Sequence, residues 1–221
     1  MNAIEHFVNR IAAERLESCF NPYADICPVH DQPLAPNIRR DNLAKALFAL
    51  SSKPRIDVWI GRDLGYKGGR RTGLALTDEF SLGAYANHLS LKSFKRSTIG
   101  AAVKERTATN VVQILEGVDT PIFTWNVFPF HPHNYSDPFS NRQHTVEEAK
   151  KGLTFLEEIL GILNVNRIIA IGNDAAKWTS GVHCEHHHVR HPSYGGQTEF
   201  LRQMSDIYSI KKSGDAQLHL I

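Results

Sequence analysis

The sequence predicts an α/β fold in which a mainly parallel sheet is covered by helices on both faces. Three short apolar runs rich in β-branched and aromatic residues begin at Ile56, Ile122 and Val165, and each has the length of a buried strand. Stretches with helical spacing of apolar residues separate these runs. Strands that alternate with helices favour parallel pairing and a layered α/β architecture.

The elements follow from the apolar spacing and from the capping and breaking residues. Ile4, Phe7, Val8 and Ile11 recur at helical spacing, and Thr145 is placed to cap a helix that starts at Val146. We expect helices over 2–18, 39–50 (with Asp41 as a cap), 97–115, 146–163 and 198–210, strands over 56–60, 122–130, 165–171 and 182–189, and irregular segments over 19–37 and 131–145.

Composition limits the class of protein. The chain has 221 residues, 42% of them hydrophobic and 22% charged, which suits one globular domain over 1–221 with its core at about 40–210. The net charge of +2 permits nucleic-acid binding. No apolar run is long enough for a membrane span, and the N-terminus lacks the apolar core of a signal peptide. Three cysteines without a Cys-x-x-Cys pattern suggest reduced thiols in the cytoplasm and argue against an iron–sulfur cluster or a zinc ribbon.

The segment from Arg55 to Thr77 is the first candidate for a functional site. Asp63 follows a predicted buried strand, and ligands of open α/β sheets bind at the carboxyl ends of strands. The turn after Asp63 is rich in glycine, which lets a backbone approach a ligand closely. Lys67, Arg70 and Arg71 give this turn a positive charge. An ordinary solvated loop between a strand and a helix is the alternative.

Three strand ends, taken in order, resemble the uracil-DNA glycosylase superfamily. They are GRDLGYKGGRRTGLAL at 61–76, WNVFPF at 125–130 and RHPSYGG at 190–196. The uracil-specific branch of that superfamily has a Gly-Gln-Asp-Pro-Tyr-His loop, a strand that ends in Asn and a His-Pro-Ser loop. The resemblance covers roughly residues 55–205 and implies a four-stranded parallel sheet between layers of helices, with no metal and no cofactor.

The resemblance implies a role for each matching residue. Asp63 would position the attacking water and favour a cationic sugar, and Asn126 would hydrogen-bond the edge of the base. His191 would donate to the base carbonyl as negative charge builds there. Each also has a structural alternative: a loop cap for Asp63, a strand-end amide for Asn126 and a histidine before a turn proline for His191.

The same resemblance implies contacts with the DNA backbone and a wedge in the duplex. Ser193 matches a serine that binds a phosphate, and positively charged neighbours can add to that contact. Tyr194 lies where an apolar wedge enters the minor groove. The expected DNA-binding residues are Ser193, Arg190, Tyr194, Arg70, Arg71 and Lys67.

The sequence departs from the uracil-specific pattern at the base pocket. Leu64 and Gly65 replace Pro-Tyr, and glycine also stands there in the mismatch-specific and single-strand-selective branches. A roomier pocket would accept hypoxanthine, xanthine, mismatched thymine or a 5-substituted uracil beside uracil, unless Tyr66 restores the block. Leu76 replaces an aromatic residue that stacks on the base, and this costs about 1–3 kcal/mol of binding unless Phe80 or Phe128 compensates.

These observations predict a monomeric, monofunctional DNA glycosylase of base-excision repair, whose partner is DNA with a damaged or deaminated base. A non-catalytic or covalent-trapping DNA-binding protein of the same fold is one alternative. A zinc hydrolase built on the histidines of 183–188 is another, although neighbouring residues of a strand point to opposite faces. A nucleotide binder is the third, although the glycine-rich turn lacks G-x-G-x-x-G and a P-loop lysine.

Overall fold

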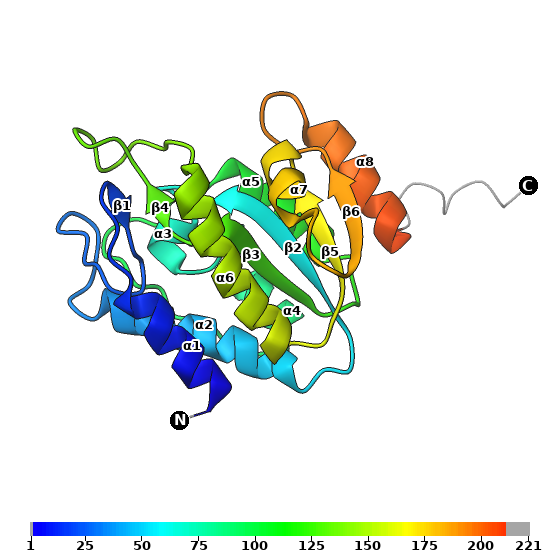
Figure 1. Cartoon of the computed structure of the whole chain (residues 1–221), viewed down its shortest axis with the longest axis horizontal. Coiled ribbons are helices and arrows are strands. Elements are labelled where there is room, and N and C mark those ends of the chain that lie inside the picture. Colours follow the sequence, from blue (N-terminus) through cyan, green and yellow to red (C-terminus); the bar gives the residue numbers. More distant parts are fainter. Residues whose placement is uncertain (1, 211–221) are drawn as a thin grey trace, which may run out of the picture.

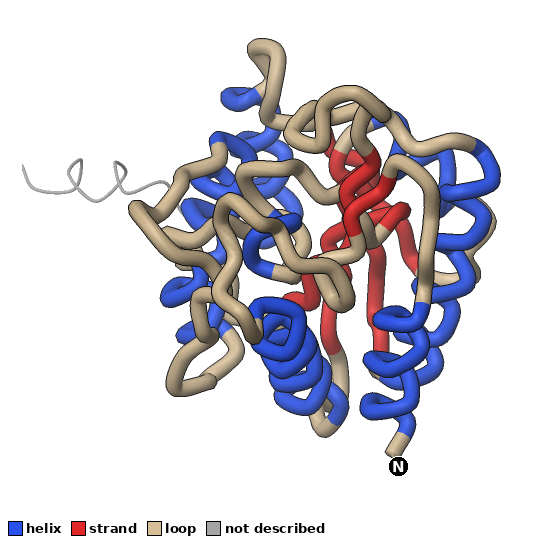
Figure 2. Tube along the Cα trace, turned by 90° about the vertical axis from the view of Figure 1, so that its left-hand side faces the viewer, coloured by secondary structure: helices blue, strands red, loops and turns tan. Residues whose placement is uncertain are grey.

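A computed structural model gives the structure of the chain and describes residues 2–210. Four parallel strands form the central sheet in the order β3 (Ile122–Phe128), β2 (Ile56–Asp63), β5 (Val165–Ile171) and β6 (Glu185–Val189). Helices cover both faces, with α6 (Val146–Ile162) in front of the sheet and α5 (Arg106–Leu115) behind it in Figure 1. The side view of Figure 2 shows the strands between the helical layers. The predicted α/β sandwich is therefore confirmed.

The remaining elements are the other helices of the two layers and a short pair of strands. α1 packs on α2 and α6, whereas α5 packs on α4 and α8. A short antiparallel pair, β1 with β4, lies apart from the main sheet. These elements are α1 (Ala3–Ala13), β1 (Cys19–Phe20), α2 (Ala35–Ser51), α3 (Gly69–Thr72), α4 (Leu82–His88), β4 (His131–Pro132), α7 (Asn173–Thr179) and α8 (Gln197–Tyr208).

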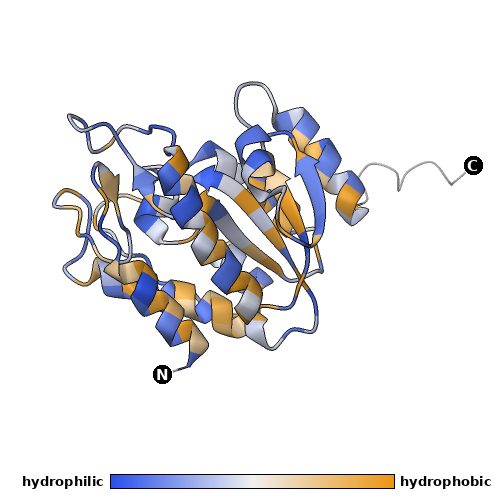
Figure 3. Cartoon of the chain, viewed as in Figure 1, coloured by the Kyte–Doolittle hydropathy of each residue, from blue (hydrophilic) through white to orange (hydrophobic). Residues whose placement is uncertain are grey.

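Burial explains why the central strands form. Every residue of β3 is buried, and the first six residues of β2 are buried as well, as expected for parallel strands covered on both faces. Figure 3 shows hydrophobic bands along these strands between paler and hydrophilic ones, and the helices around them carry both colours. Among residues 2–210, the structure contains no helix that is both long and apolar enough to cross a membrane.

α6 begins at a capping box, and its backbone packs directly against the sheet. Thr145 and Glu148 form a capping box at its first turn. A Cβ atom at Gly152 would lie 1.9 Å from the carbonyl oxygen of Val127, so only glycine allows the helix backbone to rest on β3. This contact fixes the position of the segment that enters α6.

Several element boundaries differ from the predictions for local reasons. The first helix ends at Ala13 because the amide of Asn21 donates to the carbonyl oxygens of Ile11 and Glu14. The predicted helix over 97–115 begins only at Arg106, where Glu105 caps it. The second helix starts earlier, at Ala35, and Asp41 pairs with Lys45 within it instead of capping it. β2 runs on to Asp63.

Candidate active site

Asp63 and Asn126 lie on neighbouring strands at the carboxyl edge of the sheet. Parallel pairing sets Gly61 opposite Asn126 and Asp63 opposite Phe128. Because side chains alternate along a strand, position 61 and Asp63 share one face. A Cβ atom at Gly61 would lie 2.5 Å from Oδ1 of Asn126 and 2.8 Å from Cδ2 of Leu76. The absent side chain at Gly61 therefore lets the Asn126 amide and Leu76 meet beside it.

The side-chain oxygen of Asn126 is buried without a hydrogen-bond partner. Asn126 is only 2% exposed, and no described protein atom donates to its Oδ1. A buried acceptor without a donor costs free energy, so proteins rarely keep one without a reason. An acceptor held in this way can receive a hydrogen bond from a ligand such as the edge of a nucleobase.

His191 follows β6 and reaches the same edge of the sheet from the other side of β5. Its Cβ packs against Gly172, the residue after β5, where φ is +92° and a side chain would be strained. The backbone N–H of Ser193 donates to His191 Nδ1 (3.2 Å), and the Ser193 hydroxyl lies 2.7 Å from that nitrogen. Nδ1 is therefore an acceptor, and Nε2 carries the ring proton.

The environment keeps His191 neutral. Burial lowers the pKa of this imidazole, and the cationic side chains of Arg62 and Arg190 lower it further, whereas Glu105 opposes the shift. A neutral imidazole with its proton on Nε2 is a hydrogen-bond donor that carries no charge of its own. The Ser193 hydroxyl, which was predicted to contact a phosphate, contacts the histidine in this structure.

The carboxylate of Asp63 is held by two donors on different oxygens. Nε of Arg62 donates to Oδ2 (2.7 Å), and Nδ1 of His144 makes a short hydrogen bond to Oδ1. The side chains of Asp63 and His144 are 6% and 1% exposed. His144 is absent from the sequence predictions, which treated 131–145 as an irregular segment. Its place directly before the capping threonine of α6 was the available signal.

The 131–145 segment folds against the glycine-rich turn. Oδ1 of Asn141 accepts a hydrogen bond from the backbone N–H of Tyr66 (3.1 Å), and the Tyr66 ring packs against Phe139. A Cβ atom at Gly65 would meet no atom within 4 Å. The position that decides pocket size in the resemblance is thus open in this chain.

The structure corrects the prediction that Arg70 and Arg71 bind the DNA. Both are buried, at 5% and 6% exposure. Arg70 donates to the carbonyl oxygen of Pro138 and stacks against the rings of Phe20 and Phe139, and Arg71 pairs with Glu79. Both guanidinium groups satisfy internal acceptors and are unavailable to phosphates.

The other predicted DNA contacts remain on the surface. Lys67 and Arg190 are exposed, and Tyr194 is 94% exposed in a loop where its φ is +51°. Leu76 is half-buried and also has a positive φ of +56°, a rare conformation for a residue with a side chain. The exposure of Lys67, Arg190 and Tyr194 suits the predicted phosphate contacts and wedge.

The histidine-rich strand β6 uses its side chains in local contacts. Nδ1 of His186 lies 2.7 Å from the carbonyl oxygen of Cys184, and Nε2 of His187 lies 2.9 Å from a carboxylate oxygen of Glu185. In the part of the chain that the structure describes, no three His, Cys, Asp or Glu side chains converge to hold a metal ion.

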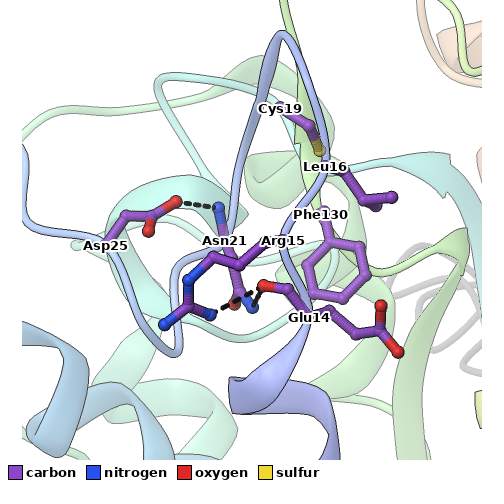
Figure 4. Close-up of a pocket in the computed structure, with 7 residues that line it drawn as sticks. All are labelled: Glu14, Arg15, Leu16, Cys19, Asn21, Asp25 and Phe130. Carbon is purple, nitrogen blue, oxygen red and sulfur yellow. Dashed lines mark hydrogen bonds between the residues drawn. The ribbon is translucent and has the colours of Figure 1, made fainter.

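A cavity of about 170 Å³ lies beside the end of α1 (Figure 4). Its polar groups bond to one another: the Asn21 amide donates to the carbonyl oxygen of Glu14, and Asp25 accepts from the Asn21 backbone. None of the predicted site residues is among those that line it, which are Glu14, Arg15, Leu16, Cys19, Asn21, Asp25 and Phe130.

The fold and the site together define a class of architecture: a parallel four-stranded α/β sandwich with an acid, an amide and an imidazole at its carboxyl edge. A solved structure with this fold is wild-type SMUG2 from Pedobacter heparinus. The two chains share 11% identity, the match covers 95% of this chain and 98% of SMUG2, and the TM-score is 0.63. At this identity the similarity shows the fold alone. No protein-family model and no curated protein matches the sequence.

Proposed function

We propose that the protein is a DNA glycosylase that hydrolyses the N-glycosidic bond of a deaminated base flipped out of DNA. The observation that carries the proposal is the gathering of Asp63, Asn126 and His191 at one edge of the sheet, with the Asn126 acceptor left unpaired. The similarity in fold to SMUG2, a DNA glycosylase, supports the same assignment.

The chemistry of the reaction matches the three side chains. As the bond between C1′ and the base nitrogen breaks, its electron pair goes to the base, and the sugar becomes a cation. The Asp63 carboxylate stabilises the cation, and Nε2–H of His191 donates to the carbonyl oxygen of the base anion. Water then adds to C1′ and gives its proton to the Asp63 carboxylate, and the base anion takes up a proton as it leaves the site. Donors and charges that are already in place lower the barrier of such a reaction more than other effects do, and one donor contributes about 100-fold or more in rate.

The loops around the site suit a kinked duplex. Flipping a base costs a few kcal/mol, which contacts to the phosphates must offset. We assign these contacts to Ser193, Arg190 and Lys67, and the insertion into the base stack to Tyr194. Inserted side chains of this kind hold a kinked duplex open.

The open space at Gly65 supports a pocket that takes bases larger than uracil. The substitution Gly65→Tyr tests this, because nothing within 4 Å of the new Cβ resists it. We expect the variant to keep the release of uracil and to lose hypoxanthine, xanthine and 5-substituted uracil. If wild-type protein and variant release the same set of bases, position 65 does not set the pocket.

A panel of oligonucleotides tests the proposal itself. Duplex and single-stranded substrates carry uracil, hypoxanthine, xanthine or a G·T mismatch, and alkali then cleaves any abasic site. We expect strand cleavage at one or more of these bases, with the free base detected by mass spectrometry. A purified, folded protein that releases none of them would rule out the proposed function.

A further inference from the structure

His144 was not among the predicted site residues, and the backbone on either side of it is held by hydrogen bonds. It immediately precedes Thr145, whose side chain and backbone form the capping box with Glu148. Arg142 holds the same Glu148 with two hydrogen bonds, of 2.7 and 2.6 Å. The backbone on both sides of His144 is therefore fixed to the first turn of α6.

The ring of His144 is also enclosed. It packs against Phe128 at the end of β3 and edge-on against Trp178 of α7, with centroids 6.2 and 6.0 Å apart. Its neighbour Gln143 donates to Asp174 at the start of α7 (3.1 Å), and Asp174 lies 3.5 Å from the guanidinium of Arg62. β2, α6 and α7 thus converge on one histidine and one carboxylate.

A carboxylate needs such support because its terminal torsion is soft. The rotation of an aspartate carboxyl group about its last bond is broad and nearly two-fold. Arg62 is 42% exposed at its side chain, so it restrains Oδ2 only weakly. His144 is 1% exposed and enclosed by aromatic rings, so its hydrogen bond to Oδ1 is the firmer restraint.

We propose that His144 is a positioning residue, which acts through its Nδ1–H to fix the Asp63 carboxylate toward the sugar of the bound nucleotide. The inference rests on the proposed function and extends it to a residue outside the three matching motifs. Nε2 of His144 is buried and has no partner among the described residues. The positioning role therefore belongs to Nδ1 alone.

Two substitutions separate the Nδ1 donor from the rest of the ring. His144→Asn can place an amide N–H near the position of Nδ1 but has no counterpart of Nε2. His144→Phe keeps a ring between Phe128 and Trp178 but has no donor. His133→Asn, in the same segment, is the control, because the His133 ring hydrogen-bonds only the neighbouring carbonyl oxygen of Asn134 within residues 2–210.

The test uses the best substrate of the oligonucleotide panel under single-turnover conditions, with DNA affinity and thermal unfolding measured in parallel. We expect His144→Phe to lower the rate of base release about 100-fold with unchanged DNA affinity, because small misplacements of a reacting group cost that much. His144→Asn should recover most of the loss, and His133→Asn should match the wild type.

Two results would overturn the inference while the proposed function stands: a wild-type rate in His144→Phe, or a rate in His144→Asn as low as in His144→Phe. If His144→Phe fails to fold, the rate of base release by His144→Asn alone decides the inference. This variant retains the donor, so it should keep most of the wild-type rate, and a large loss would overturn the inference. A wild-type protein that releases no base would instead remove the proposed function and this inference together.

Discussion

At Asn126, stability and function can be separated by experiment. Its Oδ1 is buried without a partner, so removing the amide breaks no described hydrogen bond to that oxygen. We expect Asn126→Ala to change the free energy of unfolding by no more than about 1 kcal/mol. Base release should fall about 100-fold, because the proposed function assigns Asn126 a contact with the reacting base. Denaturant unfolding and single-turnover kinetics measure the two effects.

Asn42 is the matched control for Asn126. It is also fully buried, but its amide donates to the carbonyl oxygen of Lys95 (2.7 Å) and accepts from the Lys95 N–H (2.9 Å). Asn42→Ala leaves two polar groups unpaired and should cost about 1–3 kcal/mol for each, with normal base release by the folded protein. The opposite pattern, in which Asn126→Ala unfolds the protein at full specific activity, would make Asn126 a structural residue.

Among the elements, α6 depends most on one close contact. A Cβ atom at Gly152 would overlap the Val127 carbonyl oxygen, whereas a Cβ atom at Gly161 in the same helix meets nothing within 4 Å. We expect Gly152→Ala to destabilise the fold by about 1–3 kcal/mol, as overpacking does. Gly161→Ala should stabilise it by up to about 1 kcal/mol. Equal effects in denaturant unfolding would show that α6 does not touch β3 in this way.

The 131–145 segment is anchored by a neutral histidine. Burial and the neighbouring Arg70 lower the pKa of His131 to about 3. Its Nδ1 lies 3.3 Å from Nη1 of Arg70, and its Nε2 lies 2.8 Å from the carbonyl oxygen of Ser140. Since Arg70 can only donate and the carbonyl can only accept, Nδ1 accepts and Nε2–H donates in the neutral ring.

This pKa shift makes stability depend on pH. In the unfolded chain His131 has its ordinary pKa of 6.5, so between pH 6.5 and 3 the unfolded state binds a proton that the folded state does not. The free energy of unfolding must therefore fall as the pH falls, by up to about 1.4 kcal/mol per pH unit from this group.

Denaturant unfolding between pH 7 and 4 measures this slope. We expect His131→Gln to have a shallower slope than the wild type, and His6→Gln, at an exposed position of α1, to keep the wild-type slope. Parallel curves for the wild type and His131→Gln would show that His131 is not held neutral by the fold.

At the scale of the whole molecule, the sequence predicts the strands of the sheet better than it predicts which charged side chains are exposed. Periodicity located β2, β3, β5 and α6, because long buried runs leave a pattern that does not depend on distant residues. The burial of Arg70 depends on Phe20 and Pro138, which are distant from the turn in the sequence. The burial of Arg71 depends on Glu79, which belongs to a segment without clear periodicity. The exposure of these two arginines could not be predicted from the turn alone.

His144 was missed for the same reason. The residues that define its role, Asp63 and Trp178, lie 81 and 34 positions away in the chain, and only folding brings them together. The three motif residues came from the resemblance, and their common location could be expected because each lies within two residues of the carboxyl end of a strand. Parallel strands end at one edge of a sheet. A partner that comes from an irregular segment has no such rule.

The most direct measurement of the central claim is base release by Asp63→Asn under single-turnover conditions on the best substrate of the panel. Asp41→Asn, in an exposed ion pair with Lys45 on α2, is the matched control for the loss of a carboxylate. We predict that Asp63→Asn releases base at least about 100-fold more slowly than the wild type while it still binds the DNA, and that Asp41→Asn is unaffected. An Asp63→Asn protein that releases base at the wild-type rate would contradict this account.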